Sequence, residues 1–118
     1  MTKQPAFVRA SKPDQLAAAD ALFAKLQPRF LALPGVRPGT GFGSNLGLRL
    51  EGKIFAMAVR GALVVKLPRD RVDALAAAKK GTPFVVGGRA MKEWIAVSLA
   101  AKRDWPKLVD EAHRFAQG

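Results

Sequence analysis

The side chains that could carry acid–base, nucleophilic or metal chemistry are few in this chain. His113 is the single histidine, and there is no cysteine. A nucleophile activated by an imidazole, or a zinc site built from thiolates and imidazoles, therefore lacks its partners. His113 also borders the apolar stripe of a helical pattern near the C-terminus, which indicates a structural or surface histidine. We expect no catalytic residue, no metal ion, no cofactor and no enzymatic activity.

Two pairs of carboxylates could in principle supply a general acid and a general base. Asp70 and Asp73 stand at the start of a predicted helix, where they favour capping and complement the positive helix end. Asp110 and Glu111 are adjacent in the sequence and point to different sides of another predicted helix. We interpret both pairs as structural or solvated.

Gly39, Gly41 and Gly43 form a G-x-G-x-G run. A loop that cradles phosphate normally follows a strand and opens a helix, whose N-terminus meets the phosphate. Here the glycines precede a predicted strand, and no Gly-Lys-Ser/Thr sequence follows. The run therefore predicts a turn or a bulge.

The excess of basic residues is the most unusual feature of the composition. The chain has 20 Lys and Arg against 9 Asp and Glu, a formal net charge of +11 over 118 residues. Such an excess attracts polyanions and raises the rate at which they encounter the protein. The alternative is that the positive charge serves only solubility. The candidate nucleic-acid or partner-binding residues lie on the outer face of the predicted sheet, in its loops and beside a Gly-Gly turn: Arg49, Lys53, Arg60, Lys66, Arg89 and Lys92. The alternative interpretation is a solvated sheet face.

These residues must be positioned by the elements that the hydrophobic pattern predicts. After a loose arm at residues 1–10, a helix begins with Ser11 as its N-cap, and apolar residues recur every three or four positions as far as Leu33. Pro28 lies inside this pattern, so we expect a kink or a break there. The helix ends by the Pro34–Gly35 pair.

Residues 36–43 are interpreted as a connection, and from Leu46 the hydrophobic period becomes two. A two-residue turn, Glu51–Gly52, gives a hairpin whose apolar side chains share one face. To keep that face continuous into the next strand, we expect a three-residue loop at residues 60–62, or a bulge at Gly61. The side chains expected on the shared face are Leu46, Leu48, Leu50, Phe55, Met57, Val59, Leu63, Val65 and Leu67.

A second helix follows Pro68, with Asp70 as its cap and Gly81 as its stop. Residues 82–88 are expected to be extended and to close with Gly87–Gly88.

Trp94 to Leu99 reads as a fourth strand, and a last amphipathic helix begins near Asp104. Trp94 and Trp105 are expected to be core or half-core anchors. The order α-β-β-β-α-β-α predicts an α+β fold, in which helices pack on one face of a small, mainly antiparallel sheet.

Three stretches carry a family resemblance: Gly52–Ala56, Lys66–Pro68 and Gly88–Trp94. With the final helix, they resemble the N-terminal domain of the TfoX/Sxy competence-regulator family. The chain is similar, more distantly, to small MmcQ/YjbR-type proteins described as having a DNA-binding-like α+β fold. The resemblance implies a single TfoX N-terminal-like domain over residues 1–118, without the second helical domain of full-length competence regulators. It implies no catalytic residues.

The positive charge, the missing chemistry and the resemblance together predict a small non-enzymatic regulatory or adaptor domain that acts through protein or nucleic-acid contacts. The alternative is a small-molecule-binding or enzymatic protein with an anionic-ligand cleft between the first helix and the sheet, lined by residues 39–45 and by Arg37 or Arg49. No stretch has the apolar length of a signal peptide or a membrane span, so we expect a cytoplasmic protein with no membrane partner. Exposed sheet edges would permit a homodimer.

Overall fold

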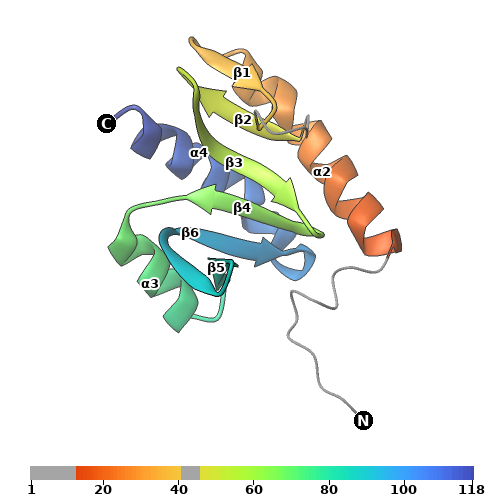
Figure 1. Ribbon diagram of the computed structural model, residues 1–118. Coiled ribbons are helices and arrows are strands. Elements are labelled where there is room, and N and C mark those ends of the chain that lie inside the picture. Colours follow the sequence, from red (N-terminus) through yellow and green to blue (C-terminus); the bar gives the residue numbers. More distant parts are fainter. Residues whose placement is uncertain (1–12, 41–45) are drawn as a thin grey trace.

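A computed structural model describes residues 13–40 and 46–118 of the chain. Within them, helices and strands follow one another as an α+β fold, which confirms the expected class (Figure 1). The elements are α2 (Pro13–Leu31), β1 (Val36–Pro38), β2 (Gly47–Leu50), β3 (Lys53–Val59), β4 (Ala62–Lys66), α3 (Arg69–Ala77), β5 (Thr82–Val86), β6 (Arg89–Ser98), the 3₁₀ helix η1 (Leu99–Asp104) and α4 (Trp105–Ala116).

In the described part of the chain, the strands form one six-stranded sheet in the order β1-β2-β3-β4-β6-β5, and every neighbouring pair is antiparallel. The predicted order holds, with two edge strands added to it. Residues 36–38 form β1 where a connection was expected, and the extended stretch after Gly81 is β5. The fourth predicted strand is also longer, because β6 begins at Arg89 rather than at Trp94.

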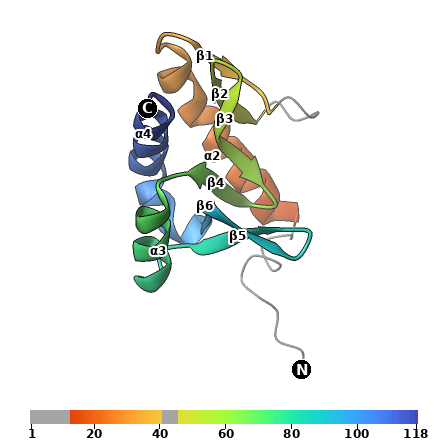
Figure 2. The same ribbon diagram turned by 60° about the vertical axis from the view of Figure 1, so that its left-hand side comes forward.

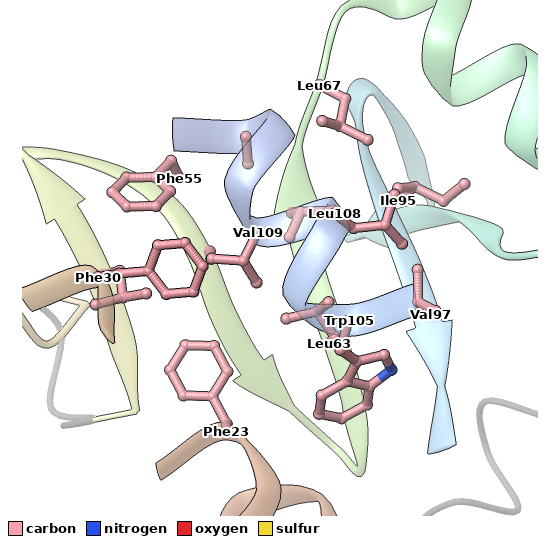
Figure 3. Packing of buried hydrophobic residues seen from close by; sticks show 14 of the residues in the cluster. Phe23, Phe30, Phe55, Leu63, Leu67, Ile95, Val97, Trp105, Leu108 and Val109 are labelled. Carbon is pink, nitrogen blue, oxygen red and sulfur yellow. The ribbon is translucent and has the colours of Figure 1, made fainter. Parts of the chain in front are cut away.

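The three α-helices pack against one face of this sheet, as expected. Side chains of α2, α3 and α4 join a single buried cluster with residues from β1, β2, β3, β4 and β6. Figure 2 shows α3 and α4 together on one side of β4, β5 and β6. Phe23 and Phe30 of α2 converge there with Phe55 of β3 and Val109 of α4 (Figure 3). Trp105 is fully buried, and its indole N–H donates to the Ser98 carbonyl at 3.1 Å.

A bulge in the β2–β3 hairpin changes which side chains share that face. The Glu51–Gly52 turn is as predicted, because Leu50 lies opposite Lys53. The register then shifts, and Leu48 lies opposite Ala56 rather than Phe55. A bulge places two residues of one strand against one of the other, so Phe55 and Ala56 both pack in the cluster beneath the helices. The expectation that Met57 and Val59 join Phe55 is wrong, since they pack on the opposite face.

The β3–β4 turn has two residues, so the expected three-residue loop is wrong. Val59 lies opposite Ala62, which leaves Arg60 and Gly61 as the loop. Both have positive φ, 49° and 81°, as a type I′ turn requires. The bulge has already reversed the phase of β3, so this short turn is what brings Ala58 opposite Leu63, on the helix-covered face. Ala56 and Ala58 therefore face the helices.

The helix boundaries depart from prediction at three points. α2 is not broken at Pro28 but continues to Leu31, and the predicted N-cap Ser11 lies outside the described residues. Asp70 does not cap α3: the N-cap position is Pro68, without a side-chain bond, and the Pro68 carbonyl accepts two first-turn N–H groups. α3 also ends before Gly81, because Lys79 adopts a φ of 60°.

Candidate functional site

The face of the sheet opposite the main cluster carries a second, smaller apolar cluster. Met57, Ala62, Val64 and Ala96 are buried in it, and the partly buried side chains packed against them are Ile54, Val59, Phe84 and Trp94. We call this the second face. Trp94 is thus a half-buried anchor here rather than a part of the core beneath the helices.

A row of cations crosses the second face along the strand register. Arg37 of β1 lies opposite Arg49 of β2, and Arg49 lies opposite Ile54 of β3. Lys66 of β4 lies opposite Trp94 of β6. Directly opposed residues in an antiparallel pair point to the same side, so all three cations share the face with the smaller cluster. We call Arg37, Arg49 and Lys66 the cationic row.

Arg49 is the most constrained member of the row. Its Nη2 donates to the Pro38 carbonyl at 3.3 Å, while its Nε is buried with no hydrogen-bond partner among the described residues. Arg37 is exposed and Lys66 is half-buried. Neighbouring strands lie about 4.8 Å apart, so two strand spacings put the backbones at Arg49 and Lys66 roughly 10 Å apart.

The other candidate residues lie outside this row. Lys53 is opposite Leu50 at the start of β3, on the helix-covered side, and is exposed. Arg60 is exposed in the β3–β4 turn. Arg89 and Lys92 are exposed on the β5–β6 hairpin, where Arg89 follows the Gly87–Gly88 tip. The six candidates therefore fall into four places rather than one platform: the cationic row, the start of β3, the β3–β4 turn and the β5–β6 hairpin.

Arg37 was assigned only to the alternative anionic cleft, and not to the cations of the sheet, because residues 36–43 were interpreted as a connection. A three-residue strand that contains a proline has almost no periodicity to detect. The only sequence signal was the apolar–charged pair Val36–Arg37 directly after Gly35. In the structure Val36 is buried and Arg37 is exposed.

Acidic residues are distributed differently from these cations. Between Val36 and Leu67 the sequence holds five cations (Arg37, Arg49, Lys53, Arg60 and Lys66) and the single acid Glu51. The ion pairs found among the described residues lie in the helical layer and its connections: Arg71–Glu111, Lys80–Asp104 and Arg114–Asp110. None of these ion pairs engages Arg37, Arg49 or Lys66, so the charge of the cationic row is not balanced by a described acid.

The Arg71–Glu111 pair has the strongest geometry of the three. Arg71 donates from Nε to Glu111 Oε1 at 2.8 Å and from Nη2 to Oε2 at 3.1 Å, a bidentate arrangement. The hydrogen bond to Glu111 is the main cause that raises the pKa of Arg71, and burial opposes it. This arginine is engaged within the fold and is a poor candidate for an external anion.

The residues first considered for chemistry have structural surroundings. His113 is 7% exposed, and its ring meets the edge of Phe55 with centroids 5.6 Å apart. Gly39 has a φ of 97°, and its N–H donates to the Gly47 carbonyl at 2.8 Å, which extends the pairing of β1 with β2. Gly41 and Gly43 lie outside the described residues, as does most of the expected anionic cleft at residues 39–45. Over the described ranges, no group of three His, Asp or Glu could hold a metal ion.

None of the helices in the described residues is long and apolar enough to cross a membrane. In the comparisons with known proteins, the model of the YjbR family matches residues 31–115, from the end of α2 through most of α4. No curated protein and no solved structure matches the chain. The likeness to the TfoX/Sxy family is not confirmed, whereas the more distant likeness to YjbR-type proteins is. The chain belongs to the YjbR family.

Proposed function

We propose that this protein is a non-enzymatic domain that binds nucleic acid by holding the phosphate backbone against the second face of its sheet. The observation that carries the proposal is the cationic row: Arg37, Arg49 and Lys66 share one face, and no acid of the described residues pairs with them. A cytoplasmic location and a regulatory role in transcription belong to the same proposal.

The spacing of the row supports contacts with a phosphate backbone. Three cations distributed over β1, β2 and β4 are separated by one and then two strand spacings, so they extend over roughly 15 Å. A strand of duplex DNA presents one charge about every 3.4 Å of its axis, so several phosphates lie within reach. Arg89 and Lys92 on the projecting hairpin extend the positive surface beyond β6.

Such an interface would read the backbone more than the bases. Phosphate contacts position a protein on nucleic acid but carry no sequence information. Trp94, the aromatic nearest to Lys66 in the register, is half-buried in the smaller cluster, so stacking contributes little. We therefore expect duplex binding with weak sequence preference and strong salt dependence.

The test measures fluorescence anisotropy of a labelled 20-base-pair duplex at about 50 mM and about 200 mM salt. With three to five phosphate contacts, affinity should fall by roughly 40-fold to 500-fold between these conditions. The double variant Arg37→Gln/Lys66→Gln should bind roughly tenfold to a hundredfold more weakly at the lower salt.

The matched control is Lys25→Gln/Lys107→Gln. Lys25 on α2 and Lys107 on α4 are exposed in the helical layer, and the control removes the same net charge. If the control loses as much affinity as the row variant, net charge rather than the row explains binding. If the unmodified protein does not bind at about 50 mM salt, the proposal fails.

A second candidate function, a protein adaptor, is favoured by one observation. Val85 and Val86 of the edge strand β5 are 50% and 52% exposed. An extended segment of another protein can add to such an edge by backbone hydrogen bonds. Binding of a protein partner that survives nuclease treatment and is lost in the Val86→Glu variant would support this function.

A further inference from the structure

A groove of about 700 Å³ lies at the end of the sheet away from the cationic row. It is formed where α3 ends, β5 begins and β6 passes into η1. Its floor consists of small side chains, and its lining also includes three cations, Lys79, Lys80 and Arg103, and one acid, Asp104. Ala62 lines this groove while Lys66 belongs to the row, so the length of β4, roughly 13 Å, separates the two.

One wall of the groove is a loop held rigidly in place. The N–H groups of Ala78, Lys79 and Lys80 all donate to carbonyls in the last turn of α3. Lys79 has a φ of 60°, in the region that non-glycine residues seldom adopt, so the chain turns sharply there. A Cβ on Gly81 would meet the Ile95 side chain at 2.8 Å, which shows how closely the loop packs on β6.

The polar groups on this groove are suited to an anion. Lys79 and Arg103 are exposed, and no ion pair among the described residues engages either one. Lys80 contacts Asp104 at 3.8 Å, but both side chains are largely exposed and such pairs contribute little. The hydroxyl groups of Thr82 and Ser98 also line the groove.

The floor is suited to the body of a small molecule. Ala62 and Ala96 are 2% and 5% exposed, and Ala76, Ala100 and Ala101 complete a lining without large side chains. The volume lies within the range of roughly 300–1,000 Å³ that small-molecule sites occupy. A flat apolar body could rest on the alanines while its anionic end meets the cations.

We propose that this groove binds a small phosphate monoester, the size of a mononucleotide, with the phosphate held by Lys79 and Arg103 and the body resting on the alanine floor. A dianionic phosphate matches two cations that no ion pair among the described residues engages, and Thr82 and Ser98 of the same lining carry hydroxyl donors. The floor shares Ala62 and Ala96 with the second face, but none of the cations of this site belongs to the cationic row, so different variants test the two proposals.

The test uses isothermal titration calorimetry of the full chain with adenosine 5′-monophosphate, adenosine and inorganic phosphate. The monophosphate should bind at least tenfold more tightly than adenosine, and Lys79→Gln/Arg103→Gln should weaken it by at least tenfold. Lys102→Gln/Lys107→Gln removes the same charge from exposed positions outside the groove lining and should change affinity less than twofold. Arg37→Gln/Lys66→Gln should likewise leave monophosphate binding unchanged.

A second measurement keeps the site testable if a variant folds poorly. Titration of the unmodified protein with the monophosphate should shift the backbone amide NMR signals of Gly81, Thr82 and Ser98 more than those of Arg37 and Lys66. The proposal is overturned by equal affinity for the monophosphate and adenosine, by equal weakening in the control variant, by the largest shifts falling on the cationic row, or by no binding at millimolar ligand.

Discussion

The two faces of the sheet differ in what covers them and in how their charges are balanced. The helix-covered face buries large side chains such as Phe23, Leu63 and Trp105 completely. The second face has a smaller cluster in which two of the four buried residues are alanines. The described ion pairs lie in the helical layer and its connections, whereas the cationic row lies on the second face. The difference indicates that the helix-covered face provides most of the stability, whereas the second face carries cations that no ion pair among the described residues engages.

The two tryptophans provide the largest test of this difference. Trp105→Ala should lower the free energy of unfolding by about 3–5 kcal/mol, because a fully buried side chain leaves a cavity. It also removes the bond from the indole N–H to the Ser98 carbonyl. Trp94→Ala, on the second face, should cost about 1–2 kcal/mol, since the side chain is half-buried. Urea denaturation measures both, and equal losses would contradict the assignment of stability to one face.

The salt dependence of duplex binding tests the role proposed for the cationic row on the second face. Arg37→Gln/Lys66→Gln removes two phosphate contacts, so the slope of log K against log salt should become shallower by about 2. The tenfold to hundredfold loss of affinity expected for this variant corresponds to about 1.4–2.8 kcal/mol of binding free energy. Lys25→Gln/Lys107→Gln should leave the slope unchanged, although it lowers net charge equally. Anisotropy titrations over a salt series give both slopes, and a parallel change in the two variants would remove the row from the interface.

The class of fold could be predicted from the sequence, but the phase of β3 could not. Alternating leucines and the Glu51–Gly52 turn were sufficient for the hairpin and for its first register pair. The bulge at Phe55 is not marked by glycine or proline, and Ile-Phe-Ala reads as ordinary strand. A single extra residue reverses every later side chain of the strand, so Met57 and Val59 were placed on the wrong face. The register depends on packing beneath α2 and α4, which local sequence does not encode.

Two residues of the cationic row, Arg49 and Lys66, were placed on the correct face of the sheet from the sequence. Arg49 and Lys66 lie on β2 and β4, and the bulge is on the intervening strand. Within β2 and β4, each cation alternates with leucine or valine residues that face the helices, namely Leu48, Leu50, Val65 and Leu67. The faces predicted for these two strands are therefore correct, whereas those predicted for the later residues of β3 are wrong. Lys79 and Arg103 had no signal, because the groove joins a helix end to a 3₁₀ helix more than twenty positions later.

The turn that joins β2 to β3 offers a smaller effect. Gly52 has a φ of 85°, and nothing lies within 4 Å of a Cβ placed there. Gly52→Ala should therefore lower stability by about 1 kcal/mol through backbone strain alone. Gly88→Ala is the matched control, with a φ of 78° and equally open space on the β5–β6 hairpin. If Gly52→Ala also weakens duplex binding while Gly88→Ala does not, the turn helps to orient Arg49; denaturation and anisotropy measure the two effects.

The smallest effect is expected for the ion pairs of the helical layer. Arg71→Gln should cost about 0.5–1 kcal/mol, because its bidentate pair with Glu111 is partly exposed and screened. Arg114→Gln should cost about 0.3 kcal/mol, as for other exposed i,i+4 pairs. The pKa of Arg71 is raised in the fold, so its contribution is complete below the unfolded value and is lost only as pH rises through the folded one. The cost of Arg71→Gln should therefore be the same at about pH 6 and about pH 9. Neither substitution should change duplex affinity more than Lys25→Gln does, and a larger loss would move the interface to the helical layer.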